Sequence, residues 1–331
     1  MKYRLLGGSD LNVSVISFGA WQIGDPRYWG PESQADADAT VGAALDAGVN
    51  LFDTAEWYGA GESERVLGRA LGSRRKQVFI ASKVSAEHCA PADLRVACEA
   101  SLQRLGADVI DLYQVHWPFR HVPFEEAHEE MEKLRSEGKI RHIGVSNFGV
   151  RDLAKWMKSG ACVSDQLGYS LLFRSIEYEI VPACLRYNVG VLAYMPLMQG
   201  LLAGRWKTVD EIPENRRRTR HFASARSGVM HTEEGCESLT FTALSQIRQI
   251  ADRIGQPMAN VALAWLIQQP AVTSVIVGGR NPAQLRANLA AAELQLDPGV
   301  IWELSDVTEP LKQHFGANAD MWRSGAESRI R

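Results

Sequence analysis

The 331-residue chain has few cysteines, no long apolar run and no strong excess of either charge. Its five cysteines are scattered and contain no CxxC pair, which argues against a disulfide framework or zinc knuckle and favours reduced thiols in a cytoplasmic protein. No uncharged stretch approaches the roughly 18 apolar residues of a membrane span, and residues 1–13 lack the apolar core of a signal peptide. The net charge of −3 gives no electrostatic case for nucleic acid or an anionic membrane as a partner.

What the sequence does contain is an alternation of short β-branched runs with helical patterns. Several runs are apolar throughout, as expected for parallel strands that are buried on both faces. Helical patterns occupy 36–48, 63–71, 93–106 and 123–138, and the last ends at Gly138, a glycine suited to a helix C-terminus. The eight expected strands are 13–20, 49–55, 77–84, 109–116, 140–147, 162–169, 189–196 and 272–279.

Eight strand–helix repeats favour a closed (β/α)8 TIM barrel over an open doubly wound sheet. An open sheet would need a switch point and usually a phosphate-binding glycine loop after its first strand, and neither is evident. We therefore expect one domain over residues 1–331. Residues 200–237 form a long, polar and basic interval, which is typical of a functional or disordered loop, and the polar tail 316–331 has no pattern that predicts structure.

Four polar or ionisable residues fall at or just after the C-terminal ends of three consecutive expected strands, where the loops of a barrel gather. Asp53 ends the second strand and Tyr58 follows it, Lys83 ends the third and His116 ends the fourth. A lysine ammonium lowers the pKa of a nearby phenol from about 10, an aspartate keeps that lysine charged, and a histidine can orient a substrate oxygen. Each residue alone would more often be structural, but the four together predict a general acid that protonates a developing alkoxide.

Six longer motifs make the chain resemble the aldo-keto reductase family over roughly residues 1–295. They are GVNLFDTAEWYGAGESERVLGRAL (48–71), FIASKV (79–84), DLYQVHWP (111–118), GKIRHIGVSNF (138–148), GVLAYMPLMQGLLAGR (190–205) and IVGGRNPAQLRAN (276–288). The resemblance implies an α/β fold, a TIM barrel with an N-terminal hairpin and long loops at its C-terminal face. It also implies a catalytic tetrad of Asp53, Tyr58, Lys83 and His116, with Tyr58 as proton donor. The chain looks most similar to the bacterial general-stress and sugar-oxidising reductases, and more distantly to potassium-channel β subunits.

The same resemblance implies a nicotinamide cofactor, NADP(H), with NAD(H) not excluded. Ser146, Asn147 and Gln166 match family residues that hold the carboxamide, and Tyr194 matches the aromatic residue on which the ring stacks. Arg280 would bind the adenosine 2′-phosphate ahead of a helix expected to begin near Pro282, because a guanidinium and a helix N-terminus both favour an anion. The expected cofactor contacts are Trp21, Ser146, Asn147, Gln166, Tyr194, Pro196, Leu197, Gly200, Gly278, Gly279, Arg280, Gln284 and Asn288.

Three departures from the family pattern touch the cofactor site. The family often has Lys-Ser where this chain has Gly278-Gly279, and Tyr-Ser-Pro-Leu where residues 194–197 are Tyr-Met-Pro-Leu. Its frequent Tyr-Asn is Tyr169-Ser170 here. These changes leave open the preference for NADPH over NADH and the contacts to the pyrophosphate.

Aromatic residues are expected to form the substrate pocket, together with Trp21 and the 200–237 loop. They are Tyr28, Trp29, Trp57 and Trp117. Such a wall suits an aromatic aldehyde and also a sugar, so the expected substrate is a small carbonyl compound, alcohol or sugar; an oligomer is possible. A rival hypothesis of another class is a redox-sensing subunit that binds NADPH tightly, turns over slowly and signals to a partner.

Several other motifs are interpreted as structural. Residues 59–64, GAGESE, approach a dinucleotide-binding fingerprint but end in Glu64, so we predict a turn capped by Ser63. His128 has a glutamate four residues later where a zinc protease has histidine, which indicates a solvated helix face. A metal-dependent barrel hydrolase would usually carry paired histidines at the end of its first strand, and residues 17–24, SFGAWQIG, contain none. We therefore expect no metal site.

One basic cluster stands out within the 200–237 loop. It comprises Arg216, Arg217, Arg218, Arg220 and His221. It could clamp a phosphate or a partner, but a solvated, flexible loop is the favoured interpretation because no aromatic platform or matching basic stripe accompanies it in the sequence.

Overall fold

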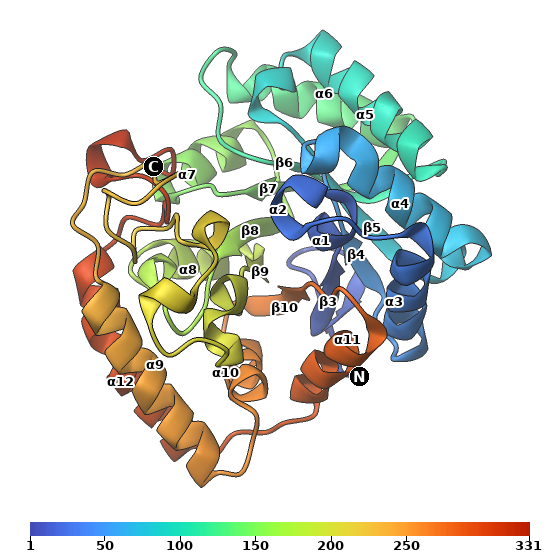
Figure 1. Ribbon diagram of the computed structural model, residues 1–331. Helices are drawn as coiled ribbons and strands as arrows, with labels where there is room; N and C mark the ends of the chain where they lie inside the picture. Colours follow the sequence, from blue (N-terminus) through green and yellow to red (C-terminus); the bar gives the residue numbers. More distant parts are fainter.

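The apolar runs of the sequence form eight parallel strands of one closed barrel in the computed structural model, which describes residues 1–331 (Figure 1). The neighbours around the barrel follow the order β10-β3-β4-β5-β6-β7-β8-β9, so consecutive strands lie side by side. The TIM-barrel fold is confirmed, and each of the eight expected ranges contains one barrel strand. The strands are β3 (Ile16–Gly19), β4 (Leu51–Asp53), β5 (Phe79–Val84), β6 (Ile110–Val115), β7 (Ile140–Ser146), β8 (Ser164–Gly168), β9 (Gly190–Tyr194) and β10 (Val272–Val277).

An antiparallel hairpin of β1 (Tyr3–Leu5) and β2 (Asn12–Ser14) precedes the barrel, as the family resemblance implied. Its Leu6, Leu11 and Val13 pack in one apolar cluster with barrel residues, including Leu51 and Leu192. The expected first strand, 13–20, is wrong at both ends. Ser14 still pairs with Tyr3 in the hairpin, Ile16 is the first residue that pairs with β10, and a short helix begins at Trp21.

Helices surround the barrel and bury their apolar faces against it, and the four expected helices are confirmed. After the short α1 (Trp21–Gly24) and α2 (Pro26–Trp29), the outer helices are α3 (Gln34–Asp46), α4 (Glu62–Leu71), α5 (Pro91–Leu105), α6 (Phe124–Ser136), α7 (Val150–Ser159), α8 (Ile180–Tyr187), α10 (Met258–Ile267) and α11 (Pro282–Leu289). Two longer helices, α9 (Glu237–Arg253) and α12 (Pro298–Phe315), pack against each other at one side of the barrel (Figure 1). None of these helices is long and apolar enough to cross a membrane.

The 200–237 loop and the C-terminal tail pack against each other instead of extending into solvent. Arg220 is 4% exposed, its backbone N–H donates to the carbonyl of Met321 at 2.8 Å, and its guanidinium pairs with Glu233 at 2.8 Å. His221 is fully buried, with Nε2 2.9 Å from the carbonyl oxygen of Leu172. The favoured interpretation of the basic cluster as a solvated loop is therefore wrong for these two residues.

The tail 316–331, for which the sequence showed no pattern, has a defined path. Met321 and Asp320 are fully buried, and the carbonyl of Arg331 accepts hydrogen bonds from the backbone of Arg151 and Asp152 at the start of α7. In Figure 1 the tail lies beside α7, close to the carboxyl ends of the barrel strands.

Two structural interpretations of single residues are also corrected. Ser63 does not cap a turn: it lies inside α4, where its hydroxyl donates to the carbonyl of Ala20 at 2.8 Å. His128 is 5% exposed and packs against the ring of Trp156, so it belongs to a buried helix face. No group of three or more His, Cys, Asp or Glu side chains is placed to hold a metal ion.

Candidate active site

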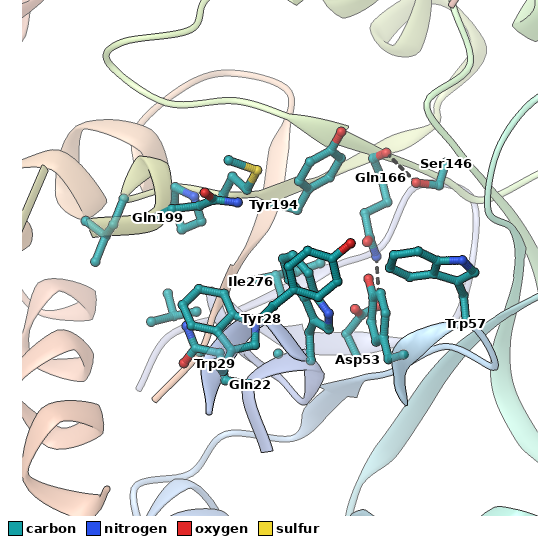
Figure 2. Close-up of a pocket in the computed structure, with 18 of the residues that line it drawn as sticks. Gln22, Tyr28, Trp29, Asp53, Trp57, Ser146, Gln166, Tyr194, Gln199 and Ile276 are labelled. Carbon is teal, nitrogen blue, oxygen red and sulfur yellow. Dashed lines mark hydrogen bonds between the residues drawn. The ribbon is translucent and has the colours of Figure 1, made fainter. Parts of the chain in front are cut away.

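The carboxyl ends of the barrel strands open into one large pocket, where a TIM barrel carries its active site (Figure 2). Its volume is about 980 Å³, at the upper end of ordinary small-molecule sites. Asp53 enters from β4, Ser146 from β7, Gln166 from β8 and Tyr194 from β9. Residues from four separate strands therefore meet at one place, as the sequence predicted.

The catalytic residues expected from the sequence converge around a buried ion pair. Lys83 Nζ lies 2.7 Å from Asp53 Oδ1, and neither side chain is more than 4% exposed. The same ammonium donates to the carbonyl of Thr54 at 2.8 Å and to the Tyr58 hydroxyl at 3.3 Å. The His116 ring meets the Tyr58 ring edge-on, with centroids 5.6 Å apart. Tyr58 and His116 line the pocket, whereas Lys83 is buried outside its lining.

Burial dominates the ionisation of these groups. It raises the pKa of Tyr58 well above 10, and the charge of Asp53 raises it further. Burial also lowers the pKa of Lys83, against the opposing attraction of Asp53. The pKa of His116 lies well below 6.5, because burial and then the Lys83 charge both disfavour the imidazolium. The sequence predicted a lowered pKa for Tyr58, and this prediction is wrong because the pKa is raised. At neutral pH the pocket therefore presents a neutral phenol and a neutral imidazole.

A chain of amide and hydroxyl groups continues from the ion pair across the pocket. Gln166 Nε2 donates to the second oxygen of Asp53 at 2.8 Å, and the Ser146 hydroxyl donates to the Gln166 carbonyl at 2.8 Å; Figure 2 shows both bonds. Asn147 Nδ2 donates to the carbonyl of His116 at 3.0 Å, and Tyr194 donates its hydroxyl hydrogen bond to Asn147 Oδ1 at 2.7 Å. Residues predicted separately as catalytic and cofactor-binding therefore form one connected network.

Strained backbone conformations gather at this network. Asn147, Met195 and Gln199 line the pocket with φ angles of 63°, 53° and 53°. Such left-handed conformations cost non-glycine residues about 1–3 kcal/mol each and persist where the surroundings impose them, often at functional sites. They place backbone and side-chain groups from the ends of β7 and β9 at the pocket wall.

An aromatic wall adjoins the residues proposed to be catalytic. Trp21 stacks on Tyr58 with centroids 5.8 Å apart and meets Trp29 edge-on at 5.3 Å. All four residues expected to contact substrate line the pocket: Tyr28, Trp29, Trp57 and Trp117. Trp57 is 47% exposed, at the mouth.

The C-terminal tail also contributes to this wall, which was not predicted from the sequence. Trp322 lines the pocket and lies nearly parallel to the Tyr194 ring, at 6.2 Å and 11°. Arg329 lines it as well, and its guanidinium lies 3.7 Å from the centre of a Trp117 ring. The Nε and Nη2 atoms of Arg329 donate hydrogen bonds to the two carboxylate oxygens of Asp320. A tryptophan within an otherwise polar tail was the one available signal, because such a large apolar side chain is usually packed against something.

Four arginines bring positive charge to the pocket wall. Arg205, Arg216, Arg218 and Arg280 all line it. Arg216 lies over the rings of Trp29 and Trp206, at 5.1 and 5.9 Å, and Arg218 lies 4.7 Å from the centre of the Tyr28 ring. Burial, followed by the charges of Arg205 and Arg280, lowers the pKa of Arg216. The side chains of these arginines are thus available in the pocket for hydrogen bonds to an anionic group.

Nearly all the expected cofactor contacts line this pocket. The members present are Trp21, Ser146, Asn147, Gln166, Tyr194, Pro196, Leu197, Gly200, Gly278, Arg280, Gln284 and Asn288. Gly279 does not line it, because it packs against Leu285 of α11, where an added Cβ would lie 3.1 Å from the leucine Cβ. The helix begins at Pro282 as expected, capped by the Asn281 side chain, which accepts from the Gln284 backbone at 2.8 Å.

Comparisons with known proteins show which family the chain is similar to. A sequence model described as "Aldo/keto reductase family" matches residues 15–309. The aldo-keto reductase YhdN of Bacillus subtilis is 32% identical over 302 aligned residues, 87% of this chain and 87% of that protein. The NADH-specific methylglyoxal reductase of Escherichia coli is 30% identical over 339 aligned positions, 95% of this chain and 100% of that protein.

Solved structures extend the likeness to three dimensions. An aldo-keto reductase from Klebsiella pneumoniae in complex with NADPH matches with a TM-score of 0.73 at 30% identity, covering 94% of this chain and 96% of that one. The glycerol dehydrogenase of Gluconobacter oxydans matches with a TM-score of 0.81 at 28% identity, covering 93% and 95%.

Proposed function

Because the chain belongs to the aldo-keto reductase family, we propose that it transfers a hydride between NADP(H) and a small carbonyl compound, or the corresponding alcohol or sugar hydroxyl. The observation that carries the proposal is the buried Asp53–Lys83 pair in contact with the Tyr58 hydroxyl, at the wall of a pocket that also holds neutral His116. The family acts on small carbonyl compounds, and the aromatic wall suits an aromatic or sugar-like member of that class.

The chain's own residues account for the proton in this reaction. A bound nicotinamide cofactor supplies or accepts the hydride. Tyr58 donates its phenolic proton to the carbonyl oxygen as that oxygen becomes an alkoxide, a far stronger base than phenolate, so a phenol of raised pKa is still an effective acid. The Lys83 ammonium, 3.3 Å away, stabilises the phenolate that remains. Neutral His116 offers a hydrogen bond that orients the carbonyl.

The pocket residues fit a nicotinamide dinucleotide along its length. Ser146, Asn147 and Gln166 offer amide and hydroxyl groups for the carboxamide, and Tyr194 offers a ring face. The arginines of the pocket wall match the charge of the phosphates, with Arg280 and the N-terminus of α11 for the 2′-phosphate. Two relatives differ in this respect: a Klebsiella structure is a complex with NADPH, and an Escherichia coli relative is described as NADH-specific.

A substrate screen tests the proposal directly. Aldehydes, ketones and sugars are tested for reduction with NADPH, and alcohols and sugars are tested for oxidation with NADP⁺. The absorbance of the cofactor is followed in each assay. Turnover of at least one compound class supports the proposed oxidoreductase activity. Tight NADPH binding without turnover of any class would contradict it and would favour the sensing subunit instead.

The first prediction concerns the 2′-phosphate. Arg280→Ala should narrow the difference between the binding free energies of NADPH and NADH by about 1–3 kcal/mol, because it removes a charge-assisted hydrogen bond that only NADPH makes. Isothermal titration with each cofactor measures these free energies. Arg286→Ala, which removes an exposed arginine from the same helix outside the pocket lining, is the matched control. A loss of affinity that is the same for NADPH and NADH, or no loss at all, in Arg280→Ala would contradict the assignment.

The second prediction concerns the 200–237 loop, which carries three of the pocket arginines. We expect it to be mobile without cofactor and to close over bound cofactor, slowing cofactor release. Limited trypsin cleavage at residues 216–218 should therefore fall when NADPH is added, and cleavage of an unrelated protein in the same mixture controls for trypsin itself. Cleavage at an unchanged rate would rule out a lid.

A further inference from the structure

A buried carboxylate lies beside the arginine assigned to the 2′-phosphate. Glu32 follows Gly30, whose φ of 80° turns the chain after α2, and precedes Ser33, which caps α3. The Glu32 side chain is only 5% exposed, and neither carboxylate oxygen has a hydrogen-bond partner. Nothing in the proposed mechanism uses this group.

Its nearest cation is Arg280. Glu32 Oε2 lies 3.7 Å from Arg280 Nε, while Arg280 Nη2 donates to the carbonyl of Pro31 at 3.3 Å. Arg280 lines the pocket and is 41% exposed, whereas Glu32 does not line it. The arginine therefore faces the cofactor pocket on one side and the carboxylate on another. The packing of α3 against α11 holds the two segments together.

The arrangement is costly as a structural device. A buried carboxylate loses its hydration and here regains no hydrogen bond, so a glutamine or a leucine would fill the space at lower cost. Burial raises the pKa of Glu32 to about 7; Asp36 also raises it and Arg280 opposes the shift. The electrostatic consequence is specific, because an anion 3.7 Å from Arg280 cancels part of the charge that the arginine presents to a phosphate.

We propose that Glu32 sets the cofactor preference of this chain by partly neutralising Arg280, so that the hold on the 2′-phosphate is weakened and NADH is used alongside NADPH. Glu32 acts through Arg280 and is a positioning residue. This inference rests on the proposed function, in which Arg280 binds the 2′-phosphate.

The test compares cofactor affinities of Glu32→Gln with the parent protein by isothermal titration. At pH 8, where Glu32 is mostly ionised, NADPH should bind about 3- to 10-fold more tightly, because one negative charge near the phosphate is removed, and NADH affinity should change less than twofold. Glu32→Leu should act in the same direction. Asp38→Asn, which removes a charge from the exposed face of α3, is the matched control and should leave both affinities unchanged.

A second arm asks whether the effect passes through Arg280 and depends on ionised Glu32. In an Arg280→Ala background, Glu32→Gln should no longer strengthen NADPH binding. Arg280 and Asp36 are the charged groups that face Glu32. Since Glu32 ionises as the pH rises through about 7, the gain from Glu32→Gln should be larger at pH 8 than at pH 6. The 2′-phosphate titrates near pH 6 in both proteins, so the ratio between them isolates the carboxylate.

The outcomes separate this inference from the function beneath it. If Arg280→Ala weakens NADPH selectively but Glu32→Gln leaves NADPH affinity unchanged or lower, the role of Glu32 is wrong and the cofactor site stands. If Arg280→Ala has no selective effect, the 2′-phosphate assignment fails and the inference about Glu32 fails with it.

Discussion

Tyr58→Phe is expected to slow the reduction of a good carbonyl substrate by about 10²–10⁴-fold, the usual contribution of a positioned general acid. The substitution removes one hydroxyl and leaves the ring that stacks on Trp21 and meets His116. Fold and pocket shape should therefore survive. The residues expected to hold the cofactor, including Ser146, Gln166 and Tyr194, lie on other strands, so NADPH affinity should change less than a few-fold.

The measurement must isolate the chemical step. Single-turnover mixing of the enzyme–NADPH complex with substrate does so, because cofactor release can limit the steady-state rate and hide the loss. Tyr113→Phe is a matched control: that tyrosine is also buried in the barrel, but its hydroxyl has no partner and lies outside the pocket lining. Near-normal single-turnover reduction by Tyr58→Phe would show that another group supplies the proton.

Lys83→Met should impair both catalysis and folding. Without the ammonium, the phenolate formed at Tyr58 faces no cation, and we expect reduction to fall by about 10²-fold or more. The Asp53 carboxylate would also lose its ion-pair partner inside the barrel, which typically costs about 3–5 kcal/mol of unfolding free energy. Chemical denaturation measures the second effect and single-turnover kinetics the first.

A double substitution separates the two effects. Adding Asp53→Asn to Lys83→Met removes the unpaired charge while retaining a side chain that can bond Gln166, so most of the lost stability should return. Reduction should stay slow, because no cation is restored beside Tyr58. Recovery of activity together with stability would mean that Lys83 serves the fold rather than the proton transfer.

The convergence of the four proposed catalytic residues could be predicted because it depends on local pattern and on one regular geometry. Apolar runs mark the strands, and in a parallel barrel consecutive strands are neighbours, as the pairing of Asp53 with Ala81 and of Lys83 with Gln114 shows. Residues at successive strand ends must then meet at one face. The family motifs placed the amide residues Asn147 and Gln166 in the same way.

Features made by chain segments without a repeating pattern could not be predicted. The tail carries Trp322 and Arg329 into the pocket through contacts with distant segments, and Arg220 is buried by the tail and Glu233. Neither contact leaves a periodic trace in the sequence. The boundary between β2 and β3 was missed for a related reason: both segments are extended, and only the change of pairing partner at Val15 separates them.

The sequence by itself determined the barrel and the meeting of Asp53, Tyr58, Lys83 and His116 at its carboxyl end, since both follow from residue type and strand order. Only the tertiary structure decided the ionisation of Tyr58, the contact of Arg280 with Glu32 and the place of the tail in the pocket wall. These depend on how completely each group is removed from water and on which charges lie within a few ångströms of it. Both quantities are set by packing between segments far apart in the chain, and desolvation outweighs the nearest charge where, as at Tyr58, burial is deep.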